Sequence, residues 1–264
     1  MFYIINIEEI SHALPEKARV ILLDTVASTN DIAKNLAAKG EAHGSLVIAK
    51  SQTNGRGRMG RSFISSSENG LYFSFILRPQ ISADKSLNIT VICAVALAKA
   101  IEETSGVGAK IKWVNDIYLN EKKCAGILTE AQLNPNCTAL DFRVVGVGVN
   151  VSTPKDGFNE EIKDIATAIY EKSAPCGYKT KLLEAFFKHF FKYYSEIESK
   201  EFMLEYKNRS NLIGKDVDVY VGEQITRGTV TDIDGDARLV VKTEDGEKSF
   251  SSGEARVRSA GKRL

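Results

Sequence analysis

Residues 45–77 read SLVIAKSQTNGRGRMGRSFISSSENGLYFSFIL, and this stretch sets the frame for the fold. Ser45–Lys50 and Leu71–Leu77 are rich in β-branched and aromatic residues, which favour strands. The segment between them is crowded with Gly, Arg and Ser, which indicates a long loop. We therefore expect a β-sheet that carries a Gly- and Arg-rich loop between two of its strands.

The flanking sequence adds helices and further strands to this sheet. Upstream, Arg19–Thr25 predicts a strand and Ser28–Lys39 a helix, with Ser28 as its cap and Asp31 as the capping-box partner. Downstream, the almost uniformly apolar run at Ser86–Thr104 predicts a buried helix. The other elements expected here are a long amphipathic helix at Lys179–Ser199 and strands at Lys110–Val114, Cys124–Glu130 and Phe142–Val151.

The character of the sequence changes after Arg209. Short β-rich runs alternate there with Gly-containing turns such as DGDA and DGEK, a pattern typical of a small β-barrel. We therefore expect two domains, residues 1–210 and residues 211–264. The strands expected in the second are Lys215–Val221, Gln224–Asp232, Ala237–Thr243 and Glu247–Ser251.

The bulk composition limits the classes of function. With 35 basic and 34 acidic residues among 264, the net charge of +1 gives no global field that attracts nucleic acid or an anionic membrane. The N-terminal apolar stretch is too short and too charged for a signal peptide or a membrane span, which predicts a cytoplasmic protein. About 20 residues precede the first predicted strand, too few for a helix-turn-helix domain, so DNA binding is not expected.

The cysteines and histidines give no sign of a metal centre. The four cysteines show no CxxC pairing and no histidine at metal-ligand spacing, so we expect free thiols and no metal held by the protein itself. They are Cys93, Cys124, Cys137 and Cys176.

The loop motif QTNGRGRMGR, Gln52–Arg61, points to anion recognition. Glycine lets the backbone approach a ligand closely, and the arginine fork donates paired hydrogen bonds to carboxylate or phosphate oxygens. The motif is neither a Walker loop, which ends in Lys-Ser/Thr, nor a dinucleotide fingerprint, which needs a strand-to-helix turn. A solvated basic loop or an RNA-contacting Arg-Gly segment is the alternative, and the position between two core strands disfavours it.

Two further clusters interrupt apolar strands. KWVNDIYLNEKKCAGILTE, Lys112–Glu130, places charged and amide side chains in and after an apolar run, although an ordinary Asn-Asp turn with solvated lysines fits as well. GVGVN, Gly146–Asn150, places glycines inside a strand, which indicates close approach by a backbone or ligand, or simple strand packing.

Taken in order, STN at Ser28–Asn30, then QTNGRGRMGR, KWVND, KKCAGIL, GVGVN and the late GEARVR resemble the motifs of biotin protein ligases. The resemblance spans about Leu22 to Arg258. It implies an α+β fold: a central mixed β-sheet with flanking helices, as in class II synthetases, plus a small C-terminal SH3-like β-barrel. The implied reaction forms biotinyl-5′-AMP from biotin and ATP with Mg²⁺, then transfers biotin to a lysine of a biotin carboxyl carrier protein, as in acetyl-CoA carboxylase. A homodimer stays open.

The same resemblance carries site roles onto individual positions. The side chains or backbone expected to hold biotin are those of Ser28, Thr29, Asn30, Gln52, Arg56, Gly57, Arg58, Lys123 and Gly126. Those expected to face ATP or the adenylate are Arg58, Arg61, Asn115, Asn150, Glu254 and Arg258. The expected catalytic residues are Lys123, at the biotin carboxylate and α-phosphate, Arg58, Lys112, at a phosphate, and Asp116, which helps to deprotonate the acceptor amine.

Three positions depart from the family pattern, and three other functions compete with this interpretation. Val114 stands where proline is usual, Cys124 where leucine or isoleucine is commoner, and Phe63 where tryptophan often follows the arginine loop. A lipoate protein ligase would share the fold and the acyl-adenylate chemistry, but Gln52 with GRGRxGR favours biotin. An RNA-binding module would show salt-dependent RNA binding and no pyrophosphate release, and a biotin-responsive repressor would need a DNA-binding domain.

Overall fold

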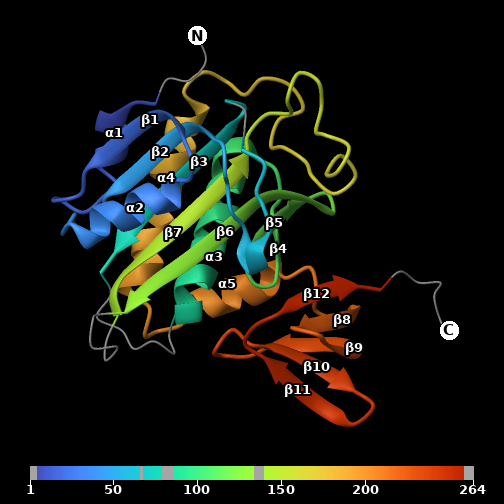
Figure 1. The fold of residues 1–264 in the computed structure, drawn as a ribbon. Coiled ribbons are helices and arrows are strands. Elements are labelled where there is room, and N and C mark those ends of the chain that lie inside the picture. Colours follow the sequence, from blue (N-terminus) through green and yellow to red (C-terminus); the bar gives the residue numbers. More distant parts are fainter. Residues whose placement is uncertain (1–4, 66–67, 79–85, 134–139, 259–264) are drawn as a thin grey trace.

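The computed structural model describes residues 5–65, 68–78, 86–133 and 140–258, and Figure 1 shows them as two β-sheets with helices packed around the larger one. The larger sheet has seven strands in the order β1-β2-β3-β7-β6-β5-β4. β1 and β2 are parallel, and every other neighbouring pair is antiparallel, which confirms the mixed central sheet. The strands are β1 (Val20–Val26), β2 (Leu46–Gln52), β3 (Gly70–Leu77), β4 (Lys110–Lys112), β5 (Asp116–Leu119), β6 (Lys122–Leu133) and β7 (Leu140–Asn150).

Helices cover both faces of the larger sheet (Figure 1). α3 (Ser86–Ser105) and α4 (Tyr178–Ser195) pack on one face, and α2 (Thr29–Ala38), which connects the parallel strands, lies on the other. Successive side chains of a strand point to opposite faces of the sheet. In β7, Val144 therefore packs in a small apolar cluster with α2, and Val145 packs in the large apolar core with α3 and α4. α1 (Ile7–Ser11) and α5 (Glu201–Arg209) complete this part.

The large core explains why the apolar runs have their particular patterns. β3 is buried along its whole length, because both of its faces are covered. α3 is buried on all sides through its middle, as its uniform hydrophobicity predicts. α4 adds a row of phenyl rings, and the ring of Phe190 meets that of Phe75 edge-on with centroids 4.9 Å apart.

The smaller sheet has five strands in the order β11-β10-β9-β8-β12, all antiparallel. This confirms a small antiparallel β unit after Arg209; closure into a barrel and the boundary at residue 210 stay predictions. The unit is attached to the main sheet by a hydrogen bond from Trp113 Nε1 to Ala237 O at 2.9 Å. Its strands are β8 (Asp216–Val221), β9 (Gln224–Ile233), β10 (Leu239–Thr243), β11 (Gly246–Phe250) and β12 (Glu254–Val257).

Several sequence-based expectations differ from the structure. Ser28 is the N-cap residue of α2, but its side chain makes no capping hydrogen bond, and Asp31 pairs with Arg56 instead of closing a capping box. No separate element was expected at β5, α5 or β12. Each offers few residues over which a period of its own could be recognised.

Two composition-based expectations can be compared with the described residues. Cys93, Cys124 and Cys176 are free thiols as predicted, whereas Cys137 lies outside the described residues. Across the described ranges, no helix combines the length and apolar character that crossing a bilayer requires.

Candidate active site

A small cavity of about 50 Å³ lies where α2, the Gly- and Arg-rich loop and strands β6 and β7 meet. It brings together parts of five motifs that are up to 120 residues apart in sequence. Every residue predicted to hold biotin lines this cavity, and so does Asn115 from the predicted ATP set. The lining residues are Ser28, Thr29, Asn30, Gln52, Arg56, Gly57, Arg58, Phe63, Asn115, Lys123, Gly126, Ile127, Leu128, Gly146, Val147 and Gly148.

The first turn of α2 and the end of β2 form a buried polar network at one end of the cavity. Gln52 Oε1 accepts hydrogen bonds from Thr29 N at 2.8 Å and Thr29 Oγ1 at 3.1 Å. Gln52 Nε2 donates to Ser65 Oγ at 3.1 Å. Ser74 Oγ lies 2.7 Å from Thr29 Oγ1 and 2.6 Å from Asn30 Oδ1. These bonds fix the side chains before any ligand arrives, which is how a polar recognition site gains specificity.

Two residues of this network, Ser74 and Glu130, were missed by sequence reasoning. Ser74 is completely buried within LYFSFIL, and a lone hydroxyl in an apolar strand is the signal that could have found it. Glu130 Oε2 accepts from Asn30 Nδ2 at 2.6 Å. No local pattern marks Glu130, because its partners come from α2 and the loop.

Gly146 has to be glycine because Asn30 occupies the adjoining space. A Cβ atom at Gly146 would lie 2.0 Å from Asn30 Oδ1, well inside contact distance. The close approach that GVGVN predicts is therefore made by a side chain of the same protein. This packing holds Asn30 against β7 and into the cavity wall.

Arg56 is neutralised by carboxylates and serves to anchor the loop. Its two terminal nitrogens contact Asp31 at 2.8 and 2.6 Å, and Nη2 lies 3.4 Å from Glu130 Oε2. Lys34 joins the same cluster, 3.2 Å from Asp31 and 2.9 Å from Glu130. The hydrogen bond from Arg56 lowers the pKa of Asp31 despite partial burial. The Arg56 guanidinium is therefore engaged by carboxylates of the protein itself.

Arg58 has the opposite environment two residues later. Its Nη1 donates to the amide oxygen of Asn115 at 3.0 Å, and it forms no ion pair within the described residues. Burial lowers the pKa of the Arg58 guanidinium, and the charge of Asp116 raises it in part. A half-buried cation that lacks a carboxylate partner is suited to receive an anion.

Lys112 is a second cation of this kind. Its Nζ lies 5.6 Å from the ring centre of Tyr118, and no carboxylate in the described part of the chain pairs with it. Burial lowers the pKa of Lys112, whereas the charges of Asp116 and Glu254 raise it. Lys112 faces Asp116 across the β4–β5 pair, so it belongs to the same corner of the sheet as Asn115.

The other predicted cations are already paired. Lys123 Nζ contacts Asp116 Oδ1 at 2.8 Å on the cavity wall. Arg61 forms a two-point ion pair with Glu254 of β12, which joins the loop to the smaller sheet. Burial alone would raise the pKa of Glu254, but hydrogen bonds from Arg61 and Arg256 outweigh it and lower the pKa to about 2.

Four residues of the predicted nucleotide set do not line the cavity: Arg61, Asn150, Glu254 and Arg258. Asn150 Nδ2 donates to Thr167 O at 3.0 Å, so this amide supports the segment after β7. Arg258 lies 3.8 Å from Asp216 and 3.9 Å from Asp218, both in the smaller sheet. Arg61 and Glu254 contact each other, whereas Arg258 contacts Asp216 and Asp218.

The three departures from the family pattern occupy distinct places. The Phe63 ring lies in the cavity against Gly126 and Gly148. Val114 is buried, and its carbonyl oxygen accepts a hydrogen bond from the Tyr206 hydroxyl at 3.0 Å. Cys124 is buried with its thiol 3.5 Å from Asn150 O, and burial raises its pKa. Of the three, only Phe63 contacts the candidate site directly.

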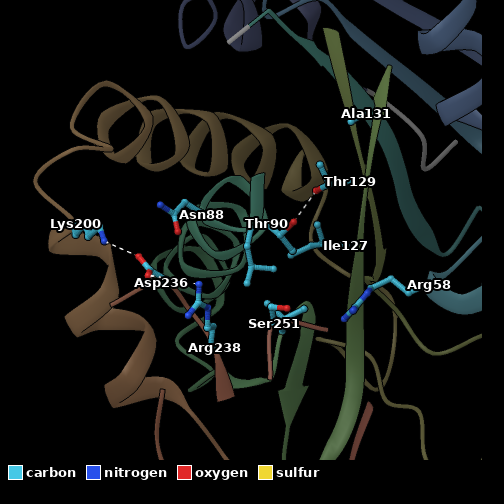
Figure 2. Close-up of a pocket in the computed structure, with 12 residues that line it drawn as sticks. Arg58, Asn88, Thr90, Ile127, Thr129, Ala131, Lys200, Asp236, Arg238 and Ser251 are labelled. Carbon is cyan, nitrogen blue, oxygen red and sulfur yellow. Dashed lines mark hydrogen bonds and ion pairs between the residues drawn. The ribbon is translucent and has the colours of Figure 1, made fainter. Parts of the chain in front are cut away.

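A second and larger cavity, of about 570 Å³, lies between α3, β6 and the smaller sheet (Figure 2). Arg58 and Ile127 line both cavities, so the larger one adjoins the candidate site. Of its residues only Arg58 was predicted, because the others come from separate elements with no common motif. Lys200 pairs with Asp236 at 2.9 Å, and Thr90 with Thr129 at 2.9 Å, on its walls.

Comparisons with known proteins agree with this geometry. Residues 22–150 match the biotin/lipoate A/B protein ligase family, and residues 212–258 match the biotin protein ligase C-terminal domain. The bifunctional ligase/repressor BirA of Bacillus spizizenii is 34% identical over 236 residues, which cover 88% of this chain and 72% of that protein. The biotin–[acetyl-CoA-carboxylase] ligase of Mycobacterium tuberculosis is 27% identical, with 82% of each chain covered.

Solved structures give the same result. The biotin protein ligase of Aquifex aeolicus in complex with biotin and ATP superposes with a TM-score of 0.75 at 31% identity, covering 92% of this chain and 99% of that one. Its R40G variant in complex with biotin gives a TM-score of 0.76 at 30% identity over the same shares of the two chains.

Proposed function

Since the chain belongs to the biotin/lipoate A/B protein ligase family and carries a biotin protein ligase C-terminal domain, we propose that it is an ATP-dependent biotin ligase. It forms biotinyl-5′-AMP from biotin and ATP and then transfers biotin to a lysine of a carrier protein. A ligand-bound relative in which both biotin and ATP are present supports this assignment.

One observation carries the residue-level proposal. All nine side chains or backbone segments that the motifs assign to biotin line a single cavity, and the one loop arginine without a carboxylate partner among the described residues lies on its wall. Binding and activation of biotin need fixed polar groups at one end of the molecule and cationic groups at the other end, where its carboxylate meets ATP. The network of Thr29 and Gln52 supplies the first, and Arg58, Lys112 and Lys123 supply the second.

The first half-reaction brings two negative charges together. A carboxylate oxygen of biotin attacks the α-phosphorus, a new oxygen–phosphorus bond forms, and pyrophosphate leaves with the electron pair of the broken bond. At about 4 Å and an effective dielectric near 20, each like-charge pair costs about 4 kcal/mol. Arg58 and Lys112 can offset this repulsion without first breaking an ion pair, and no protein nucleophile is required.

The second half-reaction joins the acyl group to the acceptor. The lysine amine attacks the acyl carbon, the carbon–oxygen bond to AMP breaks, and the amine loses its proton. Asp116 is placed to accept this proton, because the ion pair holds its carboxylate next to Lys123, which lines the cavity. Arg61 and Glu254 hold the loop against the smaller sheet, which screens the reactive adenylate from water.

Further parts of the proposal go beyond the family assignment. Mg²⁺ accompanies ATP and is held mostly by phosphates and water. The described residues contain no cluster of three or more His, Cys, Asp or Glu that could hold a metal. The acceptor is a biotin carboxyl carrier protein or domain, the compartment is the cytoplasm, and no DNA target is proposed.

Biotin-dependent exchange between ATP and labelled pyrophosphate tests this function. We expect exchange with biotin and a fall of about 10²- to 10³-fold in Lys123→Ala, the size typical of losing one preorganised charge at the reacting group. Lys122→Ala is the matched control, since its Nζ donates to Lys163 O outside the cavity. Exchange that is faster with lipoate than with biotin, or no exchange with either acid, would overturn the proposal.

A further inference from the structure

The ring of Phe63 fills the groove between two strands where a ligand chain would otherwise lie. A Cβ atom at Gly148 would come within 2.5 Å of Phe63 Cε1, and one at Gly126 would lie 3.4 Å from Cε2. Both glycines therefore leave room for the ring. Lys123 Nζ lies 6.0 Å from the ring centre, so the ring also adjoins the predicted carboxylate contact.

Backbone hydrogen bonds of the loop hold the ring in this position. Phe63 N donates to Gly55 O at 2.9 Å, and Gln52 N donates to Ser65 O at 2.8 Å. Arg56 and Ser62 form an antiparallel bridge one residue further toward the tip of the loop. The second half of the loop is thereby folded back on the first, and the ring is carried into the cavity by the loop itself.

The remaining space is too small for a bicyclic acid. The cavity holds about 50 Å³, whereas pockets for small organic ligands typically measure about 300–1,000 Å³. A water molecule takes up about 30 Å³ of liquid, so the space left beside the ring suits one or two waters. A ligand that uses this cavity must move the ring.

We propose that Phe63 is a specificity-determining residue: its ring occupies the acyl-chain groove over Gly126 and Gly148, yields to the incoming acid, and then borders the chain. This inference rests on the proposed biotin ligase function. The size of the side chain at position 63 sets how long a chain the groove accepts, because ring and chain compete for the same strip of backbone.

The test compares two acids in the exchange assay: biotin, and homobiotin, which has one additional methylene in its chain. Wild-type protein prefers biotin. In Phe63→Ala the kcat/KM for biotin divided by that for homobiotin falls by about tenfold, which is the lower limit of what one methylene is typically worth in an apolar pocket. Phe63→Leu, which retains an apolar contact with the loop, gives an intermediate ratio. Ile64→Ala is the matched control, because that neighbouring side chain is 39% exposed and does not line the cavity.

A binding measurement follows the ring without relying on catalysis. The sequence contains a single tryptophan, Trp113, which is buried against the smaller sheet. In Phe63→Trp we expect biotin to change the emission of the new indole, while biotin leaves the emission of wild-type protein unchanged.

The outcomes separate the two proposals. If wild-type protein forms no acyl-AMP from biotin, the proposed function fails. If it does so, and Phe63→Ala shows wild-type unfolding temperature with an unchanged acid ratio, the role of Phe63 is wrong. Unchanged emission of Phe63→Trp at saturating biotin would equally overturn displacement of the ring.

Discussion

The two halves of the Gln52–Arg61 loop each carry Gly-Arg, but Arg56 in the first half and Arg58 in the second have opposite electrostatic surroundings. In the first half, Arg56 is enclosed by Asp31 and Glu130, and the loop is thereby attached to α2 and β6. In the second half, Arg58 has an amide as its partner, and Arg61 reaches Glu254 on the smaller sheet. A paired arginine builds the fold, whereas an unpaired and partly buried one retains its charge for a ligand.

Arg58→Ala should produce the largest difference between the halves. We expect kcat/KM in biotin-dependent pyrophosphate exchange to fall by about 10²- to 10³-fold, as is typical when one preorganised donor to developing charge is lost. The unfolding temperature should stay near that of wild-type protein, because no ion pair is broken. If Arg56→Ala lost as much activity at saturating substrate as Arg58→Ala, the proposed difference between the two arginines would be contradicted.

Lys112→Met separates the contribution to activity from the contribution to stability. Exchange should fall by about tenfold or more, while the free energy of unfolding should stay equal or rise, since a desolvated cation without a described carboxylate partner is replaced by an apolar side chain of similar length. Chemical denaturation measures the second quantity. Lys110→Met is the control, because Lys110 lies on the same strand and is exposed. A variant that loses stability and keeps its activity would assign Lys112 to the fold.

Arg56→Ala should show the reverse pattern. Removal of the guanidinium leaves Asp31 and Glu130 facing each other with Lys34 alone, so we expect a loss of about 1–2 kcal/mol in unfolding free energy, the range for a charge-assisted network that is partly exposed. Exchange at saturating substrate should change by less than about threefold, far below the effect of a lost charge at the reacting group. Arg19→Ala, whose partner Glu41 is remote from the cavity, gives the baseline for losing a single ion pair.

Removal of the ion pair between Arg61 and Glu254 should have the smallest effect on stability, and this effect should depend on pH. The folded-state pKa of Glu254 is about 2, below its ordinary value of 4.5, so its stabilising contribution is present above about pH 4.5 and is lost as the pH falls towards 2. Glu254→Gln should therefore reduce stability near neutral pH by at most about 1 kcal/mol, as is usual for exposed ion pairs. The unfolding free energies of the two proteins should converge as the pH falls from 4.5 towards 2, and a constant difference across this range would contradict the ion pair.

The candidate site was predictable in so far as its residues carry motifs. Ser28–Asn30, Gln52, Gly126 and Lys123 were assigned to the site through the resemblance of their motifs to those of biotin protein ligases. On physical grounds alone, the Gly- and Arg-rich loop and the polar residues and glycines within apolar strands stood out. The neutralised state of Arg56 was not predictable, since Asp31 and Glu130 lie 25 and 74 residues away from it. Asp31 looked instead like a capping partner, the nearest role in sequence.

The sequence by itself determined most of the strands and helices in their order, and the change to a small β-rich unit after Arg209. Through the resemblance of its motifs to those of biotin protein ligases, it also indicated the mixed sheet and the polar residues around the smaller cavity. It could do so because burial and backbone geometry leave periodic and compositional marks within a few residues. Only the tertiary structure decided which cations are free, why Gly148 must accommodate Phe63, and where the larger cavity opens. Those features depend on pairs of atoms from distant segments, and charge neutralisation and packing act over a few ångströms in space without leaving a local mark in the chain.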